Sequence, residues 1–180
     1  MSYSLRIVAV EDTYGVRFHD ELISWLIDTG ILCNSRPRIR RMPAKKCNQA
    51  LYRKLVGIAL AKAPNNWKIL VVIDSEGRAP EEASRQDVLS HIQKRVKEHF
   101  RVAVVEPLHE AWVCLGLGGH RAICRSGKGA IRFIETTLGV RYEKRLLEKI
   151  PKMRGFTFSR LIEEHDFQAY IQSLKWLLDC

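Results

Sequence analysis

Two kinds of segment alternate along residues 5–106, and they differ in how their apolar side chains are spaced. Short apolar runs rich in β-branched residues are typical of strands buried on both faces. These runs lie at residues 5–12, 69–73 and 101–106. Longer segments, with apolar positions at helical spacing, lie at residues 16–29, 47–63 and 80–100. Strands that alternate with helices predict a parallel sheet, because parallel strands need crossover connections.

The pattern changes after Gly119. Upstream, residues 36–43 are extended and contain prolines, which suit an edge strand or a loop rather than a central strand. Downstream, helical patterns occur without a convincing strand. We therefore predict an α/β, Rossmann-like fold, with a mostly parallel sheet of about four strands flanked by helices. The α/β domain is expected to cover residues 1–118, and a helical C-terminal extension, residues 119–180, is expected to pack on it.

Acidic residues follow the predicted strands at Glu11, at Asp74 with Glu76, and at Glu106. In a parallel sheet the carboxyl ends of the strands share one crevice, where ligands bind. Asp74 and Glu76 alternate along an extended chain, so both carboxylates are expected on one side, with a hard divalent cation between them. The alternative is that these acids cap turns or the helix that opens at Pro80. Acids after three strands at one edge favour a metal site over three separate caps.

Positive charge is concentrated in one part of the chain, whose formal net charge is +10. Residues 29–73 contain ten Lys or Arg and no acid, whereas most surfaces mix the two signs. A solvated basic face is the plain interpretation, but a phosphate backbone is the expected partner of such a segment. An anionic membrane is less favoured, because segment 36–54 lacks an insertable apolar face. The expected nucleic-acid contacts are Arg38, Arg40, Arg41, Lys45, Lys46 and Arg53.

Composition adds expectations about the protein's surroundings. No run approaches the roughly 18 apolar residues of a membrane span, and the N-terminus has no signal-peptide pattern, so a cytoplasmic protein is expected. The five cysteines are scattered, with no Cys-x-x-Cys spacing. We therefore expect neither a zinc site nor a redox pair, and interpret most of these cysteines as small buried hydrophobes.

The order of the acidic motifs resembles that of the Toprim domain. The glutamate motif is matched by residues 8–11, ending in Glu11, and the acidic pair by residues 71–77. Residues 106–112, with a later Tyr-Glu-Lys at 142–144 and Phe-Ser at 158–159, look like the small stand-alone Toprim-like proteins. The resemblance covers residues 5–112 well and the tail weakly. Two departures are Asp12, where the family usually has glycine, and Glu76, where aspartate is commoner.

The resemblance implies Mg²⁺, or Mn²⁺, held by Asp74 and Glu76. Glu11 would assist as a metal ligand or as the general acid/base in phosphodiester cleavage. Glu106 and His109 would complete an outer shell.

The leading hypothesis is therefore a nucleic-acid-binding Toprim-like protein that acts as a metal-dependent nuclease on RNA or DNA. The alternative is a non-catalytic RNA- or DNA-binding module, or a subunit of a processing complex, and the residues Asp12 and Glu76 favour it. A small-molecule phosphotransferase is weaker, because residues 127–129 lack the hydroxyl residue of a phosphate-binding loop. Protein partners or a homodimer are left open, and no membrane partner is expected.

Overall fold

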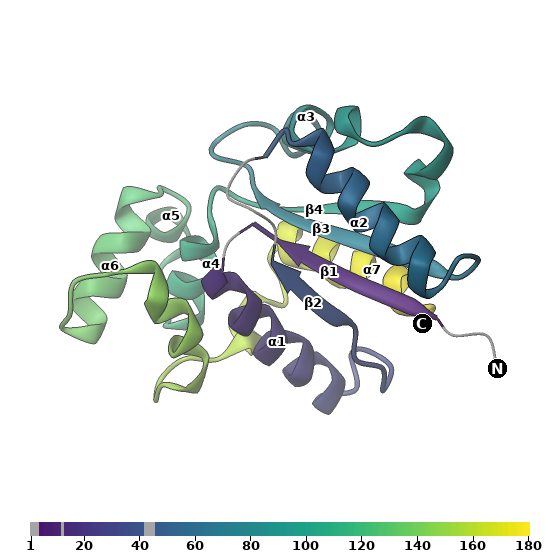
Figure 1. Ribbon diagram of the computed structural model, residues 1–180. Helices are drawn as coiled ribbons and strands as arrows, with labels where there is room; N and C mark the ends of the chain where they lie inside the picture. The colour runs from purple at the N-terminus through teal and green to yellow at the C-terminus, as the bar shows by residue number, and fades with distance from the viewer. Residues whose placement is uncertain (1–3, 12, 42–45) are drawn as a thin grey trace.

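The computed structural model describes residues 4–11, 13–41 and 46–180. Its centre is an all-parallel sheet of four strands in the order β2-β1-β3-β4 (Figure 1). The strands are β1 (Leu5–Val10), β2 (Arg38–Arg41), β3 (Trp67–Asp74) and β4 (Phe100–Val105). The predicted α/β, Rossmann-like class is confirmed, and the segment with prolines forms the edge strand β2.

Helices cover both faces of the sheet (Figure 1). The α-helices are α1 (Thr13–Asp28), α2 (Gln49–Lys62), α3 (Pro80–Asp87), α4 (His109–Gly116), α5 (Arg121–Cys124), α6 (Lys128–Leu138) and α7 (His165–Leu178). Short 3-10 helices are η1 (Leu89–His91), η2 (Lys94–His99), η3 (Lys144–Glu148), η4 (Ile150–Lys152) and η5 (Phe158–Leu161).

Alternation along the buried strands divides the core into two layers. Val8 and Val72 face a cluster shared with α1, α4 and α7, and their neighbours Ala9 and Val71 face a cluster shared with α2 and α3. Because both faces of β1 and β3 are buried, these strands read as continuous apolar runs in the sequence.

The helical region after residue 118 is built into the first of these layers. α7 packs on β3 and β4, and its Leu174 belongs to the same cluster as Leu22 of α1. Ile134 of α6 also lies in that cluster. This region therefore completes one face of the sheet rather than enclosing a core of its own.

The long helix expected at residues 80–100 is wrong. α3 ends at Asp87, and two 3-10 helices follow before β4. Ser90 Oγ donates to the carbonyl oxygen of Gln86 at 3.1 Å, and His91 Nε2 lies 3.0 Å from the same oxygen. These side chains satisfy a carbonyl that a continuing helix would have used.

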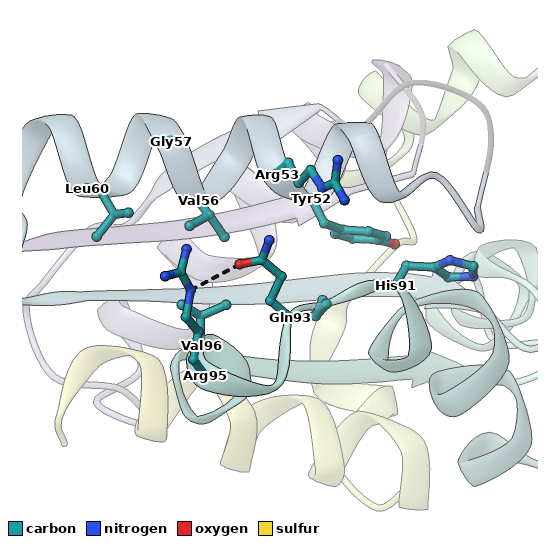
Figure 2. Close-up of a pocket in the computed structure, with 10 residues that line it drawn as sticks. Tyr52, Arg53, Val56, Gly57, Leu60, His91, Gln93, Arg95 and Val96 are labelled. Atoms are coloured by element: carbon teal, nitrogen blue, oxygen red, sulfur yellow. Dashed lines mark hydrogen bonds between the residues drawn. The ribbon is translucent and has the colours of Figure 1, made fainter.

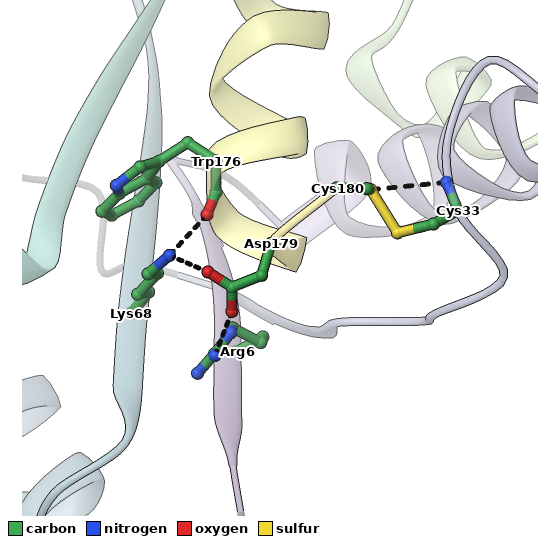
Figure 3. Close-up of a disulfide and its surroundings, with 6 residues drawn as sticks. All are labelled: Arg6, Cys33, Lys68, Trp176, Asp179 and Cys180. Carbon is green, nitrogen blue, oxygen red and sulfur yellow. Dashed lines mark hydrogen bonds and ion pairs between the residues drawn. A yellow bond between two sulfur atoms is a disulfide. The ribbon is translucent and has the colours of Figure 1, made fainter.

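The interpretation of most cysteines as small buried hydrophobes is also wrong. Cys33 pairs with Cys180, Cys114 pairs with Cys124, and Cys47 is free but exposed. Only Cys114 and Cys124 are fully buried. The first disulfide ties the loop after α1 to the end of the chain (Figure 3). The two partners lie 147 residues apart, a pairing that spacing in the sequence does not reveal.

The C-terminal residues are held at the amino edge of the sheet by charge as well. Asp179 accepts hydrogen bonds from Arg6 of β1, at 2.5 Å, and from Lys68 of β3 (Figure 3). Lys68 also donates to the carbonyl oxygen of Trp176 at 2.8 Å. Among the described residues, every helix is too short or too polar to cross a lipid bilayer.

Candidate functional site

The parallel topology brings the first two predicted acids together at the carboxyl edge of the sheet. Glu11 directly follows β1, and Asp74 is the last residue of β3. The backbone N–H of Asp74 donates to Glu11 Oε2 at 3.5 Å, a long hydrogen bond. We call the group formed by Glu11, Lys46, Asp74 and Glu76 the rim.

The ammonium group of Lys46 occupies the position that we expected for a cation. Its Nζ lies 3.4 Å from Glu11 Oε2 and 3.2 Å from Glu76 Oε1, and it donates to the carbonyl oxygen of Asp74 at 2.8 Å. The Lys46 side chain is only 11% exposed. Lys46, expected as a contact to nucleic acid, therefore neutralises the rim from within.

The backbone that places Glu76 at the rim is a turn and not the extended chain that we expected. Its φ is +54°, a left-handed conformation, so the alternation predicted for Asp74 and Glu76 ends where β3 ends. A turn forms instead, in which the Arg78 N–H donates to the Ser75 carbonyl at 3.1 Å. The Glu76 carboxylate remains 57% exposed and is the outermost acid of the rim.

Glu11 carries an unusual carboxyl group. Burial raises the pKa of Glu11, and the nearby charge of Asp74 adds to that effect. Lys46 opposes both through its charge and its hydrogen bond, without cancelling them. A carboxyl group with a raised pKa is suited to giving and taking a proton near neutral pH.

The carboxylate of Asp74 is bound by another residue of the protein, His109. Its Oδ1 accepts the backbone N–H of His109, at 3.0 Å, and lies 2.5 Å from His109 Nδ1. Burial alone would raise the pKa of Asp74, but the charge and hydrogen bond of His109, together with Lys46, outweigh it and lower that pKa. His109 therefore contacts the rim directly, closer than its predicted place in an outer shell.

A chain of hydrogen bonds continues from His109 into the core. His109 Nε2 lies 2.8 Å from Nε2 of His19 on α1, and His19 Nδ1 lies 2.8 Å from the hydroxyl of Tyr170 on α7. Both His19 and Tyr170 are fully buried. Burial, with the nearby His109, lowers the pKa of His19 well below its ordinary value, so this imidazole is neutral.

Two arrangements of hydrogens satisfy every link of this chain. With His109 neutral, the Tyr170 hydroxyl donates to His19 Nδ1, the Nε2–H of His19 donates to His109 Nε2, and the Nδ1–H of His109 donates to Asp74. With His109 protonated beside Asp74, its Nε2–H donates to His19 Nε2, and the Nδ1–H of His19 donates to the Tyr170 hydroxyl. Sequence reasoning missed His19 and Tyr170, although a histidine among the apolar positions of segment 16–29 was an available signal.

Within the described residues, the Glu106 side chain forms no ion pair or hydrogen bond with the rim. It lines a polar cavity of about 320 Å³ with Arg78, Arg121 and Arg125, beyond the ends of β3 and β4. Arg125 binds Asp166 and Glu164, at 2.7 and 2.5 Å, and also donates to the backbone carbonyl of Glu106. The cations around this cavity are thus held by acids of the chain, and the cluster fixes the start of α7 against α5.

The rim as arranged does not fit the expected Mg²⁺ or Mn²⁺. In residues 4–11, 13–41 and 46–180, no three His, Cys, Asp or Glu side chains converge in a way that would hold a metal ion. Glu11 and Glu76 share the ammonium of Lys46, and Asp74 is bound to His109. We therefore derive no reaction step through a metal.

Most of the other predicted basic contacts lie on one side of the sheet. Ile39 packs into the layer of α1, so Arg38 and Arg40, its neighbours on β2, point to the side of α2. Arg53 is exposed on α2 itself. We call Arg38, Arg40 and Arg53 the basic surface. Arg41 points to the opposite side, and Lys45 lies outside the described residues.

The basic surface differs from the rim in having no counter-charge. Within the described part of the chain, none of its three arginines forms an ion pair, whereas Lys46, Arg78 and Arg125 each have one or more. The Nε atom of Arg40 is buried and has no hydrogen-bond partner among the described residues. The side chains of Arg38 and Arg53 are exposed, so their guanidinium groups are open to an external anion.

Comparisons of the chain with protein-family models, with curated proteins and with solved structures found no match. The case for a function therefore depends on the arrangement of the residues.

Proposed function

We propose that the protein binds the phosphate backbone of a nucleic acid through the basic surface. The observation that carries this proposal is the contrast in pairing. Arg38, Arg40 and Arg53 lack counter-charges in the described part of the chain, while the cations of the rim and of the polar cavity are bound to acids. A guanidinium group presents a planar fork of donors that matches phosphate oxygens.

Phosphate contacts give affinity without sequence readout, and they release condensed counterions. Three such contacts predict that the logarithm of the binding constant falls by about 2.7 per logarithmic unit of salt on duplex DNA. On single strands the expected fall is about 2.1. An anionic partner other than a nucleic acid would not give these two slopes.

Filter binding with an RNA and DNA panel over a range of salt concentrations tests the proposal. The double variant Arg38→Gln/Arg53→Gln should reduce the salt slope by the amount expected for about two phosphate contacts. The matched control is Lys128→Gln/Arg132→Gln on α6, which removes the same charge from an exposed part of the molecule far from α2 (Figure 1). Binding that is independent of salt, or equally weakened in the control, would contradict the proposal.

A second candidate is phosphodiester cleavage at the rim, which the Toprim-like order of motifs suggests. The observation that favours it is Glu11, a carboxyl group with a raised pKa beside Asp74 at the carboxyl edge of the sheet. Cleavage assays on the same panel, with Mg²⁺, Mn²⁺ or chelator, test it. Cleavage that survives the Asp74→Asn change would remove the rim from the reaction, and no cleavage at all would leave a binding module.

We infer a cytoplasmic location from the proposed partner. The two disulfides count against this location, because disulfides are rare in a reducing cytosol.

A further inference from the structure

A groove runs between α2 and the 3-10 segment η1–η2 (Figure 2). Its volume is about 230 Å³. Val56 and Leu60 of α2 form one wall, and Val96 lies opposite them. Leu60 is 43% exposed, so part of this apolar wall is open to solvent.

Gly57 keeps the groove open. It lies inside α2, and a Cβ built on it would meet no atom within 4 Å. Glycine inside a helix costs about 0.5–1 kcal/mol relative to alanine. No close packing and no positive φ requires glycine here. The fold does not require glycine at position 57, and the free space beside Gly57 belongs to the groove.

The polar residues along the groove are basic or neutral. Arg53 and Arg95 line it together with Gln93 and His91, and no acid is among the lining residues. Arg95 Nε donates to Gln93 Oε1 at 3.1 Å, which orients that guanidinium group (Figure 2). Within the described residues neither arginine has an ion pair. An apolar slot between two unpaired guanidinium groups selects an occupant that is flat, partly apolar and attached to negative charge.

We propose that this groove holds one unpaired base of a single-stranded RNA or DNA. The inference rests on the proposed function, because Arg53 belongs both to the basic surface and to the groove. A strand whose phosphates contact Arg53 would place a neighbouring base within reach of Val56 and Leu60.

The size and chemistry of the groove suit a base better than a larger ligand. Its volume lies below the range of about 300–1,000 Å³ that is usual for drug-sized molecules. Bases that are not paired are bound by apolar surfaces, aromatic rings and the planes of arginine side chains. Val56 and Leu60 supply the apolar surface here, and Arg53 and Arg95 supply the guanidinium planes. In a duplex the bases are stacked inside the helix, so the groove selects single strands.

The test uses the full chain and fluorescence anisotropy with a labelled single strand and with the duplex of the same sequence. Gly57→Leu fills the groove without changing any charge. It should weaken binding of the single strand by about 5- to 150-fold, the effect of losing one stacked base. Binding of the duplex and the salt dependence should not change. Gly57→Ala is the control, and it should keep single-strand affinity within about twofold while leaving thermal stability equal or higher.

A second variant approaches the groove from the opposite wall. Arg95→Gln should weaken single-strand binding more than duplex binding, and an exposed position is not expected to affect folding. If Gly57→Leu and Arg95→Gln both bind the single strand as tightly as the unchanged protein does, the proposal is overturned. The proposed function still stands in that case, provided that salt-dependent binding remains.

Two further outcomes would also overturn it. If the protein binds no nucleic acid at all, the proposed function falls together with the groove. If a labelled peptide of leucine and glutamate binds in a manner sensitive to Gly57→Leu, and the single strand does not, the groove is a peptide site.

Discussion

The rim and the basic surface are both rich in charge, and they differ in what neutralises it. In the rim, one ammonium group lies within 3.4 Å of two carboxylates from separate parts of the chain, and Asp74 is bound to His109. On the basic surface, Arg38, Arg40 and Arg53 have no ion pair within the described residues. Both regions draw on the same acid-free stretch of the sequence. Charge density along a sequence therefore does not say which cations face an external partner.

The difference follows from where each residue lies in the fold. Lys46 precedes Cys47, whose φ is +61°, and Asn48, whose side chain caps α2. This tight connection directs Lys46 inward, towards the ends of β1 and β3. Arg38 and Arg40 belong to an edge strand, so side chains of a neighbouring strand lie beside them on one side only. The rim thus contributes to stability, and the basic surface remains free to bind.

The largest expected effect comes from removing the cation of the rim. Lys46→Met leaves Glu11 and Glu76 without their shared partner and should lower the free energy of unfolding by about 2–3 kcal/mol, since Glu76 is partly solvated. Urea denaturation measures the loss. The double variant Lys46→Met/Glu11→Gln should recover part of it, because the buried carboxylate is then neutral. Strictly additive losses would show that Lys46 and Glu11 are not coupled.

The next effect tests the buried chain that anchors the rim. Tyr170→Phe removes the hydroxyl beside His19 Nδ1 and should cost about 1–3 kcal/mol, because that nitrogen is left buried without a partner. Tyr52→Phe is the matched control, since it removes another buried hydroxyl, one that donates to the Asp87 carbonyl at 3.2 Å. Thermal unfolding of the two variants compares them. Equal losses would mean that the histidine chain stabilises the protein no more than an ordinary buried hydroxyl does.

Sequence pattern predicted the parts of this arrangement that depend on neighbours along the chain. The buried strands, the acids at their ends and the edge strand follow from periodicity and prolines, and the topology then brings Glu11 to Asp74. The histidine chain was not predicted, because His19, His109 and Tyr170 come from three helices and lie 90 and 151 residues apart. The inward turn of Lys46 was missed because it depends on the backbone conformation of a loop. Local side-chain bonds to Gln86, which end α3, are equally invisible to a helical pattern.

The dependence of stability on pH should come from the histidine chain behind the rim and not from the basic surface. The pKa of His19 is lower in the folded protein than in the unfolded chain, so the unfolded chain takes up a proton first as the pH falls below about 6.5. The free energy of unfolding should therefore decrease below that pH, by up to about 1.4 kcal/mol per unit. Denaturation at pH 7.5 and pH 5.5 measures this change. His19→Gln should flatten the profile, and a profile unchanged by that variant would exclude His19 as the cause.

The smallest effect on stability is expected where the effect on binding is largest. Arg53→Gln removes an exposed side chain that has no ion pair within the described residues, so the free energy of unfolding should change by less than about 0.5 kcal/mol. Its removal should still lower affinity for nucleic acid and reduce the salt slope by about one contact. Because arginine stays charged at all relevant pH values, this loss should be the same at pH 7.5 and pH 5.5. Parallel melting and binding measurements on one preparation make the comparison. If the Arg53→Gln variant unfolds at a lower temperature but binds nucleic acid normally, Arg53 stabilises the fold and does not contact nucleic acid. The basic surface would then play the same structural role as the rim.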